Sequence, residues 1–353
     1  MPRNATNISR RHVLLSLSAL GSVAFCASSG RAAADDDKTP ASIQFALDRA
    51  IDAIAAPFVL ADARGLYRAE NLNVTTTVAA GSKEAIARVA SGASDMALAD
   101  LNALIRYRGE SDAATVKAVF VLLNVAPYAI VARKSRGVIS LGSLEGKVLG
   151  VADRDLAIRL WPALAKRNNI KLAAVKQEKI SAAVREPMLS AGQVDAVTGF
   201  SYLSAVNLRD RGVPADDLAV FRFAEFGSAA YGLALIVNPK FAAARPEAVK
   251  AFIRAVTAGT QLAIRDPAMA ITDVMTQMES GSRELELTRL RTAITDNILT
   301  DDVRRDGLGG IDAARFEASL IEIAEDFTFK KRLSAADIFD DSFLPGSVGR
   351  KIN

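Results

Sequence analysis

One short phrase occurs twice in this chain. "SGASDMALAD" covers residues 91–100 and "SAGQVDAVTGF" covers residues 190–200, and their Gly-x-x-Asp cores fall at Gly92/Asp95 and Gly192/Asp195. In both copies a helix-forming stretch of small residues precedes the glycine, and a short apolar run follows the aspartate. Glycine adopts the left-handed C-terminal position of a helix without steric cost, so each copy is typical of a helix end that leads into a strand. The repetition indicates that one structural joint is used twice.

The residues around the first copy alternate between two hydrophobic patterns. Short runs rich in β-branched and apolar residues predict strands at 41–48, 73–80 and 95–99, and longer amphipathic stretches predict helices at 55–72 and 83–91. Ser82 precedes the second helix, where its hydroxyl is placed to cap a free backbone N–H. The order β-α-β-α-β is typical of a parallel sheet covered by helices.

The same order returns after the middle of the chain. Strands are expected at 147–152, 171–177 and 195–199, and helices are expected up to about Arg167 and at 181–191. Pro162 lacks an N–H, so the first of these helices either kinks at this proline or begins near Trp161. Apolar runs at 116–124, 128–134 and 231–240 connect the two series. We therefore predict an α/β protein with two similar lobes.

After residue 240 the sequence pattern predicts mainly helices. A helix is expected from Pro246 to the Asp266–Pro267 pair, because its apolar residues follow a 3.6-residue period. A second helix is expected at 284–298, and a third carries apolar residues from Phe316 to about Phe327. The tail, residues 342–353, is expected to be loose.

The N-terminus has the features of an export signal. Arg10 and Arg11 precede a moderately apolar run at 13–26, and small residues up to Ala34 come before "DDDK". The apolar run is too short to span a bilayer. "SRRHVLL" is similar to the twin-arginine signal, and an ordinary Sec signal with a chance arginine pair is the alternative. A lipid anchor at Cys26 fits poorly because bulky Phe25 precedes it. We expect cleavage near Ala34 and export to the periplasm.

Composition excludes several classes of function. The first 34 residues hold four of the 44 Lys and Arg residues and no acidic residue, so 40 basic residues remain against 40 acidic ones. Because the chain after residue 34 has equal numbers of basic and acidic residues, its charge gives no reason to expect nucleic-acid binding. His12 and Cys26 are the only residues of their types and precede the expected cleavage site, which removes histidine and thiolate chemistry from the mature chain. We expect no catalytic residue, no metal and no cofactor.

Several phrases, in order along the chain, resemble the NMT1/THI5-like group of periplasmic solute-binding proteins, which includes binders of sulfonates, nitrate and thiamine precursors. They are "APFVLADARGLYRAENLNV", "GSKEAIARVASGASDMALAD", "LEGKVLGV", "LSAGQVDAVTGF" and "ARPEAVKAFIRA", and they lie between about Ile43 and Ala270. Leu66 and Asn71 depart from the pattern, because the group usually has Tyr and Gly at these two positions.

The resemblance implies a type II periplasmic-binding-protein fold, in which two extended crossovers join the lobes. Lobe 1 would comprise residues 41–127 and 232–341, and lobe 2 residues 128–231, with the C-terminal helices packed mostly on lobe 1. A small-molecule solute would bind between the lobes, at the carboxyl ends of the strands, and closure would be a hinge motion. The expected partners are the permease and ATPase of an ABC importer in the inner membrane, and we expect a monomer.

Polar residues at strand ends are the candidate ligand contacts in lobe 1. Asp52 either binds the ligand or caps a helix, and Ser82 either caps its helix or uses the helix N-terminus to hold an anionic group. Asp100 either accepts hydrogen bonds from a ligand amine or caps the helix that follows it. Pro57 near the first strand and Asn124 at the first crossover complete this set.

The candidates in lobe 2 come mainly from "ADRDLAIRLWPALAK". Trp161 either stacks on a flat ligand or packs in the core. Thr198 and Phe200 place a hydroxyl beside an aromatic ring, and Tyr231 offers a phenol at the return crossover. The remaining two candidates are Asp153 and Arg159.

The sequence leaves the ligand and two other functions open. Aromatic rings beside hydroxyls and carboxylates suit a pyrimidine thiamine precursor or another heteroaromatic solute, whereas Ser82 and Arg159 suit a sulfonate or nitrate-like anion. Some members of the group synthesise the thiamine pyrimidine with a histidine and a cysteine-rich motif, which the mature chain lacks. A ligand-sensing subunit of a membrane signalling system is the third possibility.

Overall fold

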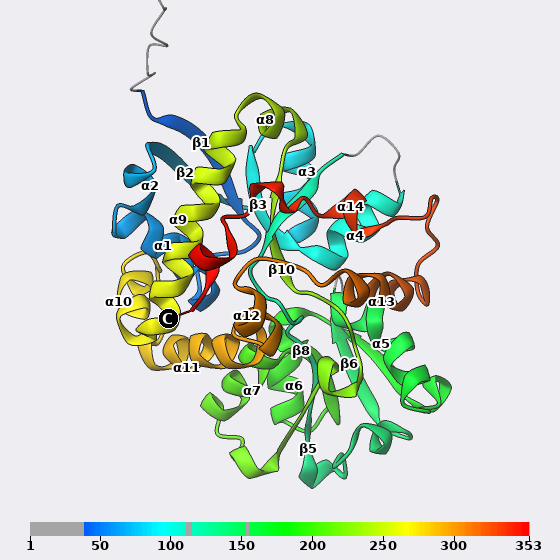
Figure 1. Ribbon diagram of the computed structural model, residues 1–353. Helices are drawn as coiled ribbons and strands as arrows, with labels where there is room; N and C mark the ends of the chain where they lie inside the picture. The colour runs from blue at the N-terminus through cyan, green and yellow to red at the C-terminus, as the bar shows by residue number, and fades with distance from the viewer. Residues whose placement is uncertain (1–38, 111–114, 153–154, 353) are drawn as a thin grey trace, which may run out of the picture. The chain divides into compact units, whose positions relative to one another are not determined.

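The computed structural model describes residues 39–110, 115–152 and 155–352. Two five-stranded sheets organise this part of the chain, with strand orders β2-β1-β3-β10-β4 and β7-β6-β8-β5-β9 (Figure 1). We refer to the halves built on the first and second sheet as lobe 1 and lobe 2. The strands are β1 (Ala41–Leu47), β2 (Leu72–Val78), β3 (Met96–Asp100), β4 (Lys117–Val121), β5 (Tyr128–Arg133), β6 (Val148–Ala152), β7 (Lys176–Ile180), β8 (Ala196–Phe200), β9 (Leu218–Arg222) and β10 (Leu233–Val237).

The repeated phrase marks the same joint in both lobes, as the sequence predicts. Gly92 and Gly192 both have positive φ, 83° and 71°, directly before the third strand of their series. Asp95 accepts a hydrogen bond from the backbone N–H of Gln44 at 2.8 Å, and Asp195 accepts one from Val148 at 2.9 Å. Each aspartate therefore ties the third strand of its lobe to the first.

Each sheet is completed by a strand that enters from the other lobe. The chain leaves lobe 1 after β4 and enters lobe 2 as β5, and it returns after β9 as β10. The strand β5 lies antiparallel beside β8, and β10 lies antiparallel beside β3. The parallel strands β1, β2 and β3 and their counterparts β6, β7 and β8 thus keep equivalent positions in the two sheets.

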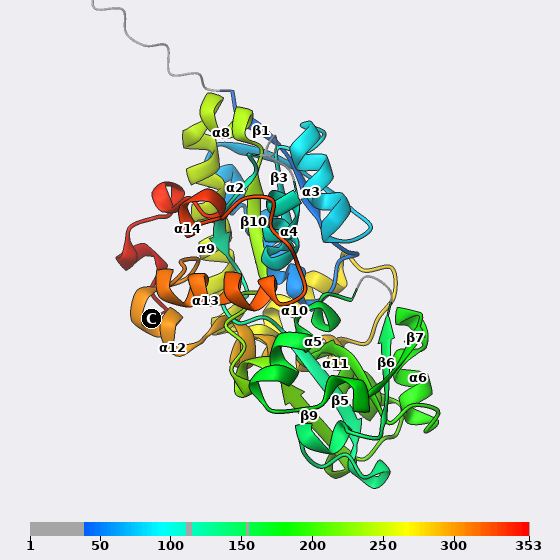
Figure 2. The same ribbon diagram turned by 90° about the vertical axis from the view of Figure 1, so that its right-hand side faces the viewer.

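Helices cover the faces of both sheets (Figure 2). Asp155 caps α5 by accepting a hydrogen bond from the backbone N–H of Ala157 at 2.9 Å, and α5 continues through Pro162, so the helix does not begin near Trp161. The helices of the two lobes are α1 (Ala56–Ala63), α2 (Leu66–Ala69), α3 (Ser82–Ser91), α4 (Leu101–Glu110), α5 (Leu156–Arg167), α6 (Arg185–Ser190) and α7 (Ser201–Asp210). Those of the C-terminal part are α8 (Pro239–Ala244), α9 (Pro246–Arg265), α10 (Pro267–Met275), α11 (Arg283–Ala293), α12 (Asp301–Asp306), α13 (Ala313–Ala324) and α14 (Ala335–Ile338).

Close packing of α9 on α1 anchors the C-terminal helices to lobe 1. A Cβ atom at Gly259 would stand 2.2 Å from the carbonyl oxygen of Pro57, so only glycine allows this approach. Phe252 of α9 also contacts Phe45 and stacks on Tyr67, with ring centroids 5.1 and 5.3 Å apart. Pro57 is buried in this contact and serves the core.

The later helices contact both lobes rather than lobe 1 alone. The helix α11 packs on α10 and also on α7 of lobe 2, and α13 packs on α5 of lobe 2 and on α14. The tail, for which we expected no fixed structure, contains a short 3-10 helix (Ser347–Arg350). Gln261 of α9 donates hydrogen bonds to the carbonyl oxygens of Gly349 and Lys351 at 3.1 and 2.8 Å.

Two local expectations are wrong. The strand expected at 171–177 is β7, which begins only at Lys176 because a 3-10 turn (Leu172–Ala174) comes first. The side chains of this edge strand are largely exposed and charged, so a hydrophobic pattern does not detect it. Ser82 does not cap α3, since Gly81 occupies the capping position and the Ser82 hydroxyl points to other partners.

The expected export signal, with its arginine pair and cleavage site near Ala34, lies outside the described residues. Within the described ranges, no helix combines the length and apolarity needed to cross a membrane.

The symmetry of the joint predicts matched effects of mutation. Asp95→Ala and Asp195→Ala should each lower the free energy of unfolding by roughly 1–2 kcal/mol, because each leaves a backbone N–H of the first strand without its partner. Denaturant unfolding of the two variants and of Asp62→Asn, an exposed control, measures this. A loss at one position with no loss at the other would contradict the equivalence of the two lobes.

Candidate functional site

Polar side chains meet at the carboxyl ends of the strands of lobe 1. Asp48 and Arg49 follow β1, and Arg49 binds the Asp48 carboxylate through two hydrogen bonds, from Nε at 3.0 Å and from Nη2 at 2.8 Å. Ser82 donates to Asp48 at 2.9 Å and accepts from the backbone N–H of Asp100 at 3.0 Å. The Ser82 hydroxyl therefore joins the ends of β1 and β3.

Arg49 connects this group of lobe 1 residues to lobe 2. Its Nη1 donates to the Tyr202 hydroxyl at 3.3 Å, and its guanidinium carbon lies 5.2 Å from the centroid of the Phe200 ring, within cation–π range. Phe200 and Tyr202 stack with centroids 5.8 Å apart. A cavity beside Arg49, lined by residues of lobe 1, has about 10 Å³, which is too little for a solute. The lobes meet at this point, with Arg49 between them.

A second group of polar residues joins both crossovers to lobe 1. Tyr128, at the start of β5, donates to Asp100 at 2.5 Å. Asn102 Nδ2 lies within hydrogen-bond distance of Asp100 Oδ1 at 3.1 Å, of the Tyr128 hydroxyl at 3.1 Å and of the Tyr231 carbonyl oxygen at 2.7 Å. All three side chains are buried. Because Tyr128 and Tyr231 lie on different crossovers, this group is placed where a hinge motion would bend the chain.

Lobe 2 presents a third group at the ends of its own strands. Arg185, the first residue of α6, donates to Asp155 at 3.2 Å and to the carbonyl oxygen of Thr198 at 2.9 Å. The Thr198 hydroxyl donates to the same carboxylate of Asp155. Arg185 Nε and the nearby Ser201 hydroxyl are buried without a hydrogen-bond partner among the described residues.

Two carboxyl groups near the cleft have pKa values well above their usual range. Burial raises the pKa of Asp100 from 3.8 to about 6, although hydrogen bonds from Tyr128 and Asn102 partly oppose this rise. Burial likewise raises the pKa of Asp52 to about 6, with Arg49 acting in the opposite direction. Burial and then the negative charge of Asp100 raise the pKa of the Tyr128 phenol, and Asp155 adds to this effect. The closed cleft therefore holds negative charge that is poorly solvated.

Some of the residues expected from the sequence come together in these groups. Ser82 and Asp100 are in direct contact, Phe200 faces Arg49, and Thr198 contacts Asp155. Asp52 lies next to them but uses its carboxylate to cap a 3-10 helix (Ala53–Ala55), accepting from the Ile54 N–H at 2.9 Å. Asp100 caps α4 through the N–H groups of Asn102 and Ala103.

The remaining candidates lie elsewhere. Trp161 is fully buried in the core, so its ring is not available to a solute in this conformation. Arg159 is exposed and pairs with Asp326 at 3.7 Å. Asn124 contacts Thr300 and Arg315, while Tyr231 contacts Asp312, all in the C-terminal part of the chain. Asp153 lies outside the described residues.

Sequence reasoning missed the residues that connect the lobes. Asp48 ends a predicted strand and Arg49 follows it directly, so the rule that selected Asp100 would also have found them. Tyr128 and Arg185 gave no such signal. Their roles depend on β5 crossing into lobe 2 and on α6 starting later than the expected helix.

A search of protein-family models matches residues 53–270 to the family described as NMT1/THI5 like. The chain belongs to the NMT1/THI5-like family. A curated relative in Schizosaccharomyces pombe, 4-amino-5-hydroxymethyl-2-methylpyrimidine phosphate synthase, is 25% identical over 221 residues, which are 60% of this chain and 62% of the relative. This NMT1/THI5-like chain therefore spans less than two thirds of the length of that relative.

Solved structures support the fold of this NMT1/THI5-like protein. The alkanesulfonate-binding protein SsuA from Xanthomonas axonopodis pv. citri, bound to MOPS, has a TM-score of 0.63 and 16% identity over 85% of this chain and 99% of its own. A ligand-binding component of an ABC-type import system from Staphylococcus aureus, with zinc bound, has a TM-score of 0.64 and 12% identity over 86% of this chain and 97% of its own. The two-lobed fold of periplasmic binding proteins is therefore confirmed.

In the described part of the chain, no three His, Cys, Asp or Glu side chains are arranged to hold a metal ion.

The raised pKa of Asp100 predicts a specific dependence of stability on pH. The folded state keeps the Asp100 proton up to pH about 6, whereas the unfolded chain loses it near pH 4, so the free energy of unfolding falls as pH rises between these values. In Asp100→Asn the free energy of unfolding should fall by roughly 2–3 kcal/mol less over this pH range, while the cap of α4 is kept. Unfolding measured from pH 4 to 7, with Asp62→Asn as control, tests this. An unchanged pH profile in Asp100→Asn would show that this carboxyl group is not the titrating one.

Proposed function

We propose that this protein is the exported solute-binding component of an ABC-type importer. The observation that carries the proposal is the meeting of Arg49 from lobe 1 with Phe200 and Tyr202 from lobe 2 at the carboxyl ends of the strands. Open parallel sheets bind ligands at these ends, and two lobes closing on them enclose a small molecule. The fold of the SsuA neighbours and the expected N-terminal signal support export to the periplasm and delivery to a permease and its ATPase.

The charges around the cleft favour a solute that donates hydrogen bonds. Both cleft arginines already have carboxylate partners, since Arg49 pairs with Asp48 and Arg185 with Asp155. Asp52 and Asp100 have no cation of their own, and burial raises their pKa values. A sulfonate or nitrate would add negative charge to this surplus, whereas an amine or amidine group would offset it.

The geometry of Arg49 indicates what the solute resembles. Its planar, cationic guanidinium is bound edge-on by Asp48 and faces the Phe200 ring. An aminopyrimidine has the same flat shape and a similar donor edge, so it can stack on Phe200 and hydrogen-bond a carboxylate as Arg49 does. We therefore favour a pyrimidine thiamine precursor or a related amino-heteroaromatic over an anion.

Release of Arg49 from lobe 2 has a small energetic cost in this arrangement. Among the contacts of Arg49, only the hydrogen bond to Tyr202 and the contact with Phe200 cross between the lobes, and each contributes about 0.5–1.5 kcal/mol. The ion pair with Asp48 stays within lobe 1 and holds the side chain when the lobes part. A solute can then replace the guanidinium on the Phe200 ring.

Synthesis of the pyrimidine is the competing function, because the curated relative has that name. Residues 39–352 contain neither His nor Cys, the residue types that carry the chemistry in the synthesising members of the group. This observation favours binding without turnover. Incubation with pyridoxal phosphate and iron, followed by mass spectrometry, distinguishes the two, and a pyrimidine product would contradict the binding-only function.

A solute screen tests the proposed function directly. 4-Amino-5-hydroxymethyl-2-methylpyrimidine at a hundredfold excess over its dissociation constant should stabilise the protein by roughly 3 kcal/mol in a thermal-shift assay, whereas methanesulfonate and nitrate should not. Phe200→Ala should weaken binding at least about tenfold through loss of stacking, measured by calorimetry. Phe241→Ala, on α8 of lobe 1, is the matched control. Stabilisation by the sulfonate alone would overturn the amine-bearing class, and no stabilisation by any solute would overturn the binding function.

A further inference from the structure

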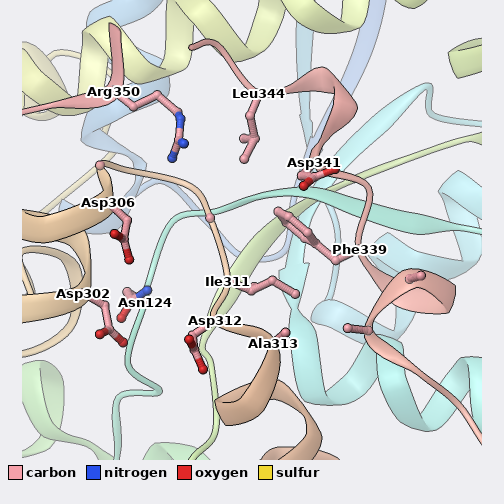
Figure 3. A pocket seen from close by; sticks show the side chains of 14 residues that line it. Asn124, Asp302, Asp306, Ile311, Asp312, Ala313, Phe339, Asp341, Leu344 and Arg350 are labelled. Atoms are coloured by element: carbon pink, nitrogen blue, oxygen red, sulfur yellow. The ribbon is translucent and has the colours of Figure 1, made fainter. Parts of the chain in front are cut away.

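A cavity of about 390 Å³ lies outside the interlobe cleft, among C-terminal segments that cover lobe 1 (Figure 3). It shares no lining residue with the small space beside Arg49. Its walls come from α12 and the loop between α12 and α13, from the segment that contains α14, from the tail and from Asn124 at the first crossover. Its volume suits a small organic molecule.

Asn124 supplies an unused donor to this cavity. The side chain is only 4% exposed, and its Oδ1 accepts hydrogen bonds from Thr300 at 2.8 Å and from Arg315 at 2.9 Å. These two donors fix the orientation of the amide, so Nδ2 is the group left for the cavity, and no described residue accepts a hydrogen bond from it. This amide N–H₂ is therefore a donor that an acceptor on an occupant can satisfy.

Arg350 supplies positive charge at another part of the wall. Its Nε donates to the carbonyl oxygen of Pro345 at 2.9 Å and its Nη1 to that of Leu308 at 2.6 Å, which hold the guanidinium in place. Figure 3 shows the end of this side chain pointing into the cavity. Nη2 has no hydrogen bond to a described residue, so a donor with full charge is available there.

Carboxylates supply the opposite charge. Asp302 and Asp306 both pair with Arg305, so their charges are largely compensated. Asp312 uses Oδ1 to cap α13, accepting from the Arg315 N–H at 2.8 Å, and its Oδ2 accepts no hydrogen bond from any described residue. Ile311, Phe339 and Leu344 form the apolar part of the wall. Asp341 also lines the cavity, and the charges of Asp306 and Asp341 act on Arg350. The cavity thus combines a cationic donor at Arg350 Nη2, carboxylate oxygens and an apolar surface.

We propose that this cavity is a second binding site, for a small zwitterion of the apolar α-amino acid type. The carboxylate of the occupant is held by Arg350 and Asn124, its ammonium group by Asp312, and its side chain by the apolar wall. An anion would meet the uncompensated carboxylate, and a simple amine would leave Arg350 and the Asn124 amide without acceptors. Only a molecule with both charges satisfies all three groups.

The position of the cavity connects it to both crossovers. Asn124 leads into the first crossover, and the backbone N–H of Asp312 donates to the Tyr231 hydroxyl beside β10 at 2.9 Å. An occupant therefore contacts residues that also move when the lobes open. This site does not depend on which solute binds in the cleft.

Calorimetry with L-leucine and two truncated analogues tests the proposal on the full-length protein. L-leucine should bind at least about tenfold more tightly than 4-methylpentanoate, which lacks the ammonium group, and than 3-methylbutylamine, which lacks the carboxylate, because each loses a charge-assisted hydrogen bond. This comparison needs no variant. Equal binding of the three compounds, or no binding of leucine at millimolar concentration, would overturn the proposal.

A substitution locates the site. Asp312→Asn keeps the cap of α13 and should weaken leucine binding at least about tenfold, without weakening the binding of 4-methylpentanoate. Asp266→Asn is the matched control, because Asp266 caps α10 in the same way, accepting from Met269 at 2.9 Å, outside the cavity. Leucine binding that Asp312→Asn leaves unchanged and Phe200→Ala abolishes would place the amino acid in the cleft and refute the second site. Failure of the pyrimidine to bind would leave this result unaffected.

Discussion

The two crossings of the chain between the lobes are the constraint on which the structure depends. The second sheet forms only after the first crossing, which leads into β5, and the first sheet lacks β10 until the chain has crossed back. The crossovers attach next to β3 and β8, the strands that follow the repeated Gly-x-x-Asp joint. This attachment directs the carboxyl ends of both sets of parallel strands toward one cleft. The polar residues at those ends then meet without any long loop to bring them together.

Uncompensated charge distinguishes the cleft from an ordinary buried interface. Four carboxylates, Asp48, Asp52, Asp100 and Asp155, lie near two guanidinium groups, and burial raises the pKa values of Asp52 and Asp100. Protein interiors tolerate buried charge poorly unless it is paired. A protein selected for stability alone would not maintain this surplus, whereas one that binds an amine-bearing solute gains affinity from it. Arg49 partly substitutes for that solute when the lobes are closed.

Much of the fold was predictable from the sequence, because local patterns encode local structure. The positive φ of Gly92 and Gly192 and the strands on either side follow from residue type and hydrophobic period. The edge strand β7 was placed too early, since its charged, exposed residues carry no hydrophobic signal. Trp161 illustrates the limit for the site, because a lone aromatic residue gives no sign of whether its ring faces the core or the cleft. The contacts of Arg49 and Tyr128 depend on which elements face each other across the lobes.

The most direct test of the account is the distance between the lobes with and without solute. Because His12 and Cys26 precede the described region and residues 39–352 contain no cysteine, Lys83→Cys on α3 and Ala182→Cys before α6 introduce one spin-label site on each lobe. Pulsed electron resonance should show a broad distribution of distances for the empty protein and a single short distance with a saturating amino-heteroaromatic solute. Identical distributions in the two samples, with binding verified by calorimetry, would contradict closure of the lobes on a solute.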